Sequence, residues 1–207
     1  MFPILAGLLS AAGAIVGALS KLGLALGALK AVGNIIGAFA KALGLVKPDR
    51  DVEDLGDRAM QAEQQGLTPD KFDSYKDWVK KIEGDDWGYD PEKTKDVDAK
   101  EKIDKGIEVS SAVSMDEFPS LPIEAFLGLV GKNLDIFSES RMKEFANIAK
   151  TNSDLFSKIT GYMTGSIKDH NVINTVTDTL MEIEKRLDAT ISDDRAYDKV
   201  ASFYSRK

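Results

Sequence analysis

The first 47 residues constrain the fold more than any other part of the chain. Residues 1–20 contain no charged side chain, and residues 22–46 contain only Lys30 and Lys41. About 20 consecutive apolar residues suffice for a helix that crosses the hydrocarbon core of a bilayer. The two stretches therefore predict either one continuous helix of roughly 65 Å or a helical hairpin that bends near Ser20 and Lys21.

The glycines of this segment recur in a regular pattern. Three GxxxG pairs lie ten residues apart, at positions 13 and 17, 23 and 27, and 33 and 37. On a helix, steps of three and four residues place nearly every small or polar residue on one stripe. This small-residue stripe consists of Ser10, Gly13, Gly17, Ser20, Gly23, Gly27, Lys30, Asn34, Gly37, Lys41 and Gly44.

The stripe predicts a helix-packing or water-facing surface, and it implies more than one copy of the chain. In lipid, small residues let helix backbones approach each other closely. Polar side chains such as Lys30 and Asn34 would then face a partner helix, an aqueous lumen or the headgroups. Each glycine disfavours a helix in water by roughly 1 kcal/mol relative to alanine. The segment therefore needs surroundings that enforce helicity.

Three environments are compatible with this pattern. The first is a spanning or pore-lining helix or hairpin, and the second is an amphipathic helix that lies in the membrane interface. The third is a Gly/Ala-rich helix buried in a protein assembly without lipid. A cleaved signal peptide fits less well, because no lysine precedes the apolar run and the Gly/Ala pattern continues past Ser20.

Charge is distributed unevenly along the chain. The formal net charge is −7, yet residues 1–47 carry four lysines and no acidic residue. Residues 48–105 carry 18 acidic and 11 basic residues, and residues 106–207 carry 16 and 12. A basic apolar segment on an acidic body predicts an anionic lipid membrane as a partner of the first segment. Nucleic acid is not expected to bind the acidic body, because no basic cluster is visible there.

Residues 48–119 predict a charged helical connector. Pro48 ends the apolar segment, and residues 51–65 predict a short polar helix. A second helix is expected from Thr68, as N-cap, and Pro69, as first helical residue, up to Gly84.

Two further stretches of the connector are predicted to lack regular structure. The acidic loop at residues 85–90 does not have the ligand spacing of an EF-hand, so we expect a solvated linker there and no calcium site. The serine-rich residues 110–122, which include Pro119 and Pro122, predict a break between helices.

Residues 120–207 predict a helical bundle domain. Apolar residues recur there at helical spacing, and we find no convincing strand. The most regular run steps by three and four residues and resembles a coiled-coil seam of about two heptads. This helical seam consists of Ile173, Val176, Leu180, Ile183 and Leu187. The chain as a whole is therefore predicted to be all-α.

The sequence offers no constellation of catalytic residues. Cysteine is absent, and His170 is the single histidine, which excludes thiol chemistry and a multi-histidine metal site within one chain. His170 is expected at the start of a helix. Phosphate-binding loops, dinucleotide-binding glycine patterns and nucleophile elbows are not visible. We therefore expect no enzyme activity, no cofactor and no metal.

These observations leave three hypotheses about function. The first is a virion or particle component that penetrates or anchors to a membrane, because the chain resembles, in composition alone, small phage proteins that help to deliver DNA. The second is a secreted pore-forming toxin or bacteriocin-like effector, and the third is a scaffold that packs through its N-terminal helix. All three predict homo-oligomers. The first also predicts a membrane-associated or virion location and allows other particle proteins as partners.

Overall fold

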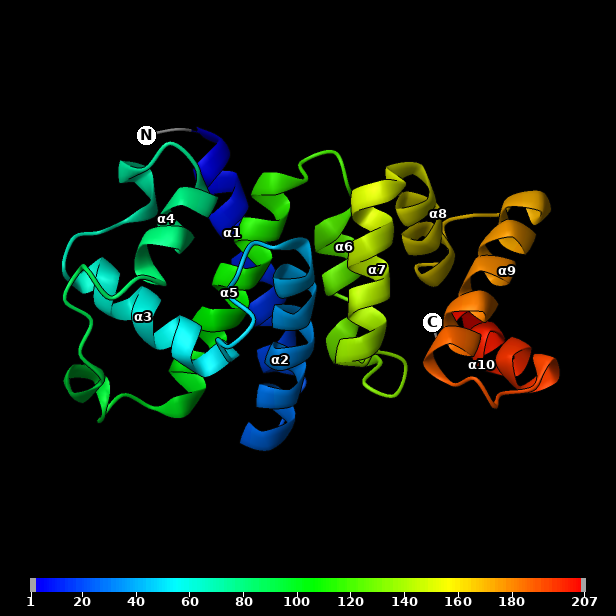
Figure 1. Ribbon diagram of the computed structural model, residues 1–207, viewed down its shortest axis with the longest axis horizontal. Helices are drawn as coiled ribbons and strands as arrows, with labels where there is room; N and C mark the ends of the chain where they lie inside the picture. The colour runs from blue at the N-terminus through cyan, green and yellow to red at the C-terminus, as the bar shows by residue number, and fades with distance from the viewer. Residues whose placement is uncertain (1–2, 206–207) are drawn as a thin grey trace.

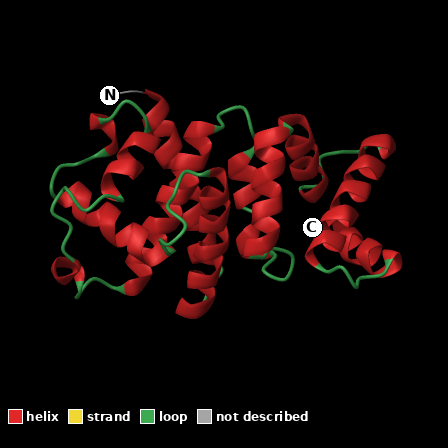
Figure 2. Ribbon diagram, in the orientation of Figure 1, coloured by secondary structure: helices red, strands yellow, loops and turns green. Residues whose placement is uncertain are grey.

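The computed structural model describes residues 3–205, and all regular structure in this range is helical (Figure 2). The prediction of an all-α protein is confirmed. The α-helices are α1 Pro3–Lys21, α2 Leu26–Leu43, α3 Val52–Gln64, α4 Tyr75–Ile82, α5 Ala99–Glu117, α6 Ile123–Leu127, α7 Glu139–Thr151, α8 Ser153–Met163, α9 His170–Leu187 and α10 Asp193–Ser205. Short 3-10 turns occupy Pro69–Lys71, Pro91–Thr94 and Val130–Lys132.

The apolar N-terminal segment forms two helices. The break between them falls just after Lys21, close to the predicted bend, and Gly23 there has a φ of +60°, which glycine adopts readily. The two helices run in opposite directions (Figure 1). Both lie against α5, and α2 also lies against α7. The segment is therefore continuous in space with the rest of the fold.

Helix α5 occupies the centre of the N-terminal half of the molecule (Figure 1). Helices α1, α2, α3 and α4 all pack on it, and its residues Val109–Met115 are buried without exception. Two glycines allow α3 to cross it closely: a Cβ on Gly56 would overlap the carbonyl oxygen of Lys102, and a Cβ on Gly106 would overlap that of Val52. Backbone contact at this crossing fixes the position of α3.

The prediction of a break at residues 110–122 is wrong in its first half. Helix α5 continues to Glu117, and Ser110, Ser111 and Ser114 are buried in the middle of it. Ser114 donates a hydrogen bond to the carbonyl of Ser110 at 2.8 Å, which satisfies a hydroxyl within the helix. Serine serves here as a small side chain that allows a close contact between helices. The helical periodicity of the sequence does not reveal this packing role.

The start of the second connector helix also differs from the prediction. Thr68 makes no side-chain cap, and Pro69 begins only a 3-10 turn. Helix α4 begins at Tyr75, where the Ser74 hydroxyl accepts the backbone N–H of Asp77 at 3.1 Å. Asp116 of α5 accepts the N–H of Tyr75 at 2.9 Å. This tertiary contact fixes the start of α4 and could not be seen in the local sequence.

The C-terminal part consists of helices α6 to α10, and an aromatic cluster connects it to α2. The ring of Phe126 lies 5.4 Å from that of Phe39 on α2, 5.3 Å from Phe145 and 4.9 Å from Phe156, measured between centroids. All four rings are fully buried. Phe39 therefore places the second apolar helix within the same core as the bundle.

Candidate functional site

The outward face of α1 is the first candidate site. The helix packs on the core through Ala12, Ile15 and Leu19, which are buried. Its opposite face is exposed and consists of small residues, among them Ser10, Gly13, Gly17 and Ser20. A Cβ added at Gly13 or Gly17 would meet no atom within 4 Å. Within the described residues, the glycines in the α1 part of the small-residue stripe therefore face open space.

The α2 part of the small-residue stripe lies in different surroundings. Gly37 is buried, and a Cβ on it would lie 4.0 Å from the hydroxyl of Ser110 on α5. A Cβ on Gly33, its partner in the GxxxG pair, would lie 2.9 Å from both methyl groups of Val52. On α5, Gly106, Ser110 and Ser114 repeat at the same four-residue spacing. Helix α2 thus meets α5 through a small residue on each side where Gly37 lies beside Ser110.

Two polar members of the stripe, Lys30 and Asn34, face the start of α3. The Lys30 ammonium lies 2.6 Å from a carboxylate oxygen of Glu53 and 3.4 Å from one of Asp51. The amide oxygen of Asn34 accepts the backbone N–H of Val52 at 3.3 Å. The hydrogen bond to Glu53 raises the pKa of Lys30. These contacts attach the middle of α2 to α3.

Asp51 lies at this contact between α2 and α3, and opposing effects act on its pKa. Burial alone would raise its pKa, but the backbone N–H of Asp54 and the charge of Lys30 outweigh burial and lower the pKa below 3.8. The Asp51 carboxylate also accepts the N–H of Asp54 at 2.8 Å as the N-cap of α3. The charged form is thus the one that the fold stabilises.

The remaining stripe residues serve the turns and ends of the two helices. Gly27 is exposed in the first turn of α2, and a Cβ there would meet nothing within 4 Å. Gly23 and Gly44 both have positive φ, at the α1–α2 turn and at the C-cap of α2. Lys41 lies in the last turn of α2 and is partly exposed. One sequence pattern therefore covers several structural roles.

The helical seam lies on α9. Val176, Leu180 and Ile183 are fully buried, whereas Ile173 and Leu187 are partly buried. Helix α9 packs against α7, α8 and α10 of the same chain. Beside the seam, the buried Glu184 accepts two hydrogen bonds from Arg141 of α7, at 2.7 and 2.8 Å. The seam is thus used in packing within the bundle.

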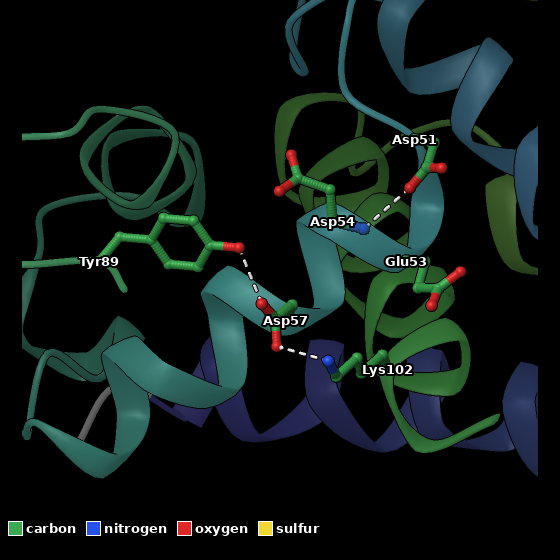
Figure 3. A pocket seen from close by; sticks show the side chains of 6 residues that line it. All are labelled: Asp51, Glu53, Asp54, Asp57, Tyr89 and Lys102. Atoms are coloured by element: carbon green, nitrogen blue, oxygen red, sulfur yellow. Dashed lines mark hydrogen bonds and ion pairs between the residues drawn. The ribbon is translucent and has the colours of Figure 1, made fainter. Parts of the chain in front are cut away.

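An acidic pocket of about 260 Å³ lies along α3 (Figure 3). Its carboxylates are paired with donors or cations: Asp57 accepts the Tyr89 hydroxyl at 2.8 Å and lies 3.3 Å from the Lys102 ammonium. Burial raises the pKa of Tyr89, and the hydrogen bond to Asp57 adds to this effect. Within residues 3–205, no group of three or more ligands is placed to hold a metal ion. The pocket is an ion-pair network that joins α3 to α5.

One helix in the described range is long and apolar enough to cross a membrane. It is α2, over Leu26–Leu43, and half of its residues are buried inside the protein. The apolar part of α1, Ala6–Lys21, is shorter. The core helix of a water-soluble protein passes the same test of length and composition, so the test leaves the environment of α2 open.

Comparison with models of protein families, with curated proteins and with solved structures gives no match for this chain.

Proposed function

We propose that the protein is non-enzymatic, interacts with membranes and self-associates, and that it serves as a virion or particle component that penetrates or anchors to a membrane. One observation carries this proposal: α1 exposes a face with no charged side chain over residues 6–20. A surface helix that stays in water normally turns charged or polar side chains outward. We infer that this face meets lipid or a second copy when the protein acts.

The attachment of α1 supports the proposal. In the described part of the chain, no side chain of residues 6–20 forms a hydrogen bond or an ion pair. Apolar contact holds the helix, including that of Leu19 with Gly131. Detaching Ile15 and Leu19 into water costs roughly 1.5–3 kcal/mol each, but transfer of the same side chains into hydrocarbon recovers that free energy. The folded position of α1 therefore competes with a membrane on nearly equal terms.

Self-association follows from the same face. Gly13 and Gly17 leave the α1 backbone open to close approach, with Ser10 and Ser20 beside them. Small residues at this spacing promote helix pairing in lipid, where no hydrophobic driving force acts between helices. Inserted copies of α1 would therefore associate through this face.

A second candidate function is a secreted pore-forming effector, and one observation favours it. Helix α2 is stored half-buried within a fold whose remaining segments, residues 48–207, are rich in charged residues. A protein that travels through water before insertion needs such storage, because an exposed apolar helix of this length would aggregate. Release of α2 would require the ion pairs of Lys30 with Asp51 and Glu53 to break.

Dye leakage from anionic vesicles tests insertion. The informative variant is Gly13→Lys, because its new side chain points into open space in the folded protein. A lysine near the centre of a spanning helix disfavours insertion by about 2.5 kcal/mol, which corresponds to a roughly 70-fold slower leakage. The added positive charge attracts the protein to an anionic surface, so a loss of leakage cannot come from weaker docking.

Asn174→Lys is the matched control, because it adds the same charge at an exposed position of α9. Leakage that the control retains and Gly13→Lys loses supports insertion of α1. Equal leakage from both variants would overturn it. Oligomers that form in water and do not bind to vesicles would favour the scaffold function instead.

A further inference from the structure

Four lysines gather around a pocket between the C-terminal end of α2 and helix α4. The pocket has a volume of about 350 Å³. Its lining includes apolar residues of the loop after α2, with Leu45 and Val46 buried beneath the surface. We call it the basic pocket, and its charged residues are Lys41, Lys47, Lys76, Lys80 and Glu83.

Only part of this positive charge is neutralised. The Glu83 carboxylate accepts the backbone N–H of Lys47 at 2.7 Å, and the Lys47 ammonium donates to the backbone carbonyl of Glu83 at 2.9 Å. Lys76 forms an ion pair with Glu117 at 2.8 Å. In the described part of the chain, Lys41 and Lys80 have neither an ion pair nor a side-chain hydrogen bond. Glu83 and Glu117 offset two of the four lysines, which leaves two positive charges at the pocket of a chain whose net charge is −7.

We propose that the basic pocket binds the phosphate group of an anionic lipid headgroup. Lysine binds phosphate as a point charge, and a pocket that combines ammonium groups with apolar residues suits a phosphate whose other substituent is apolar. Basic pockets between transmembrane helices are known to bind anionic headgroups. Nucleic acid fits less well, because two unpaired lysines at one pocket do not make the extended basic surface that a polyanionic backbone requires.

The position of the pocket indicates what headgroup binding would do: it would orient α2 at a membrane. This inference rests on the proposed function. Lys41 lies in the last turn of α2, while the exposed Leu22 and Leu26 lie beside the turn that precedes this helix. The 18 residues of α2 separate these two ends by roughly 27 Å. A headgroup in the basic pocket would hold one end of α2 at the membrane surface.

Vesicle flotation tests the pocket with the full-length protein. The vesicles contain phosphatidylcholine with or without phosphatidylglycerol. The double variant Lys41→Gln/Lys80→Gln removes the two unpaired charges. At about five-fold per lysine near an anionic surface, we expect roughly 25-fold weaker binding to the anionic vesicles. The reciprocal variant Glu83→Gln keeps an oxygen for the N–H of Lys47 but removes a negative charge, so its binding should strengthen by up to about five-fold.

The matched control is Lys143→Gln/Lys150→Gln, which removes two exposed lysines of α7 and changes the net charge equally. Circular dichroism verifies that all variants fold. Weaker binding of the pocket variant alone supports the proposal, and equal losses in both double variants overturn it. If wild-type protein causes leakage while the pocket variant binds like the control, insertion stands and the pocket fails. If wild-type protein binds through the pocket without leakage, the pocket stands and insertion fails.

A second experiment, with soluble phosphate compounds in place of vesicles, identifies the source of the phosphate. Glycerophosphoglycerol should raise the thermal midpoint of the wild-type protein, but not that of Lys41→Gln/Lys80→Gln. Inorganic phosphate should act more weakly, because it lacks the two glycerol groups that would make additional contacts with the lining of the pocket. An equal effect of inorganic phosphate, together with no vesicle binding, would overturn the lipid assignment and leave a site for free phosphate.

Discussion

Helices α1 and α2 carry the same ten-residue glycine repeat, yet their glycines lie in opposite surroundings. Gly13 and Gly17 of α1 face open space, whereas Gly33 and Gly37 of α2 are buried against α3 and α5. The difference comes from their neighbours: α2 also carries Lys30 and the apolar Phe39, and both have partners elsewhere in the fold. Glycine spacing thus shows where a backbone can be approached, while other residues decide what approaches it.

The largest effect is expected where glycine lets α3 reach α5, beside the buried half of α2. In Gly106→Ala the new methyl group would overlap the carbonyl oxygen of Val52, and backbone cannot rotate away as a side chain can. We expect the free energy of unfolding to fall by about 3 kcal/mol or more. Urea unfolding followed by circular dichroism measures it. An unchanged urea midpoint would contradict the close backbone contact between α3 and α5 at Gly106.

A matched pair of leucine substitutions tests the comparison itself. Gly33→Leu should destabilise the fold by about 2 kcal/mol, because its Cβ already lies 2.9 Å from the methyl groups of Val52. Gly17→Leu should leave stability in water unchanged or slightly higher, since leucine is the better helix former. In vesicles the order should reverse, with association of the α1 helices weakened by Gly17→Leu. Unfolding curves and cross-linking in vesicles report the two effects.

The attachment of α2 to α3 should contribute less. Lys30 and its partners are partly exposed, so solvent screens the ion pair. We expect Lys30→Gln to lower the free energy of unfolding by about 0.5 kcal/mol, and added salt should shrink the difference between variant and wild type. Gly13→Ala, on the helix without ion pairs, should show no such dependence on salt. A salt-independent loss in Lys30→Gln would assign the effect to packing.

The smallest effect is expected at Glu83, the C-cap of α4 that contacts the loop after α2, and it depends on pH. Burial raises the pKa of Glu83 above 4.5, although the N–H of Lys47 opposes this. A raised pKa in the folded state means that Glu83 favours folding most below pH 4.5 and loses this contribution as pH rises through the folded-state value. Glu83→Gln should therefore gain stability relative to wild type at neutral pH, and the gain should vanish in acid. Thermal unfolding across this pH range measures both.

Much of the fold could be predicted from the sequence because helical periodicity reports local burial. The α1–α2 bend, the start of α9 at His170 and the regular run on α9 all follow from residues close together in the chain. The burial of α5 could not be predicted in this way. Its serines are polar by composition but small by volume, and only the approach of α2 and α3 from elsewhere in the sequence makes small volume the property that counts.

The candidate sites show the same limit. The small-residue stripe was visible as a pattern, but the division between its exposed and buried parts depends on which helices pack on it. The basic pocket combines Lys41 with Lys76 and Lys80, which lie more than thirty residues further along. No local pattern joins these positions, and the acidic average of residues 48–105 conceals them. Lysines that come together only when the chain folds cannot be recognised as a cluster in any short stretch of the sequence.

The row of Gly106, Ser110 and Ser114 on α5 has a consequence for exchange between molecules. Ser110 of this row lies beside Gly37 of α2 of its own chain, whereas Gly106 lies against Val52 of α3, and a second copy that supplied α2 and α3 would meet the same geometry. A short linker keeps the effective concentration of the chain's own helix on the order of millimolar. In dilute solution, packing of α2 on its own chain is therefore favoured over packing on a second copy. Crowding at a surface removes that advantage. Two molecules that opened side by side would then be able to close on each other, and we expect an oligomer formed in this way to reuse the contacts that exist within one chain.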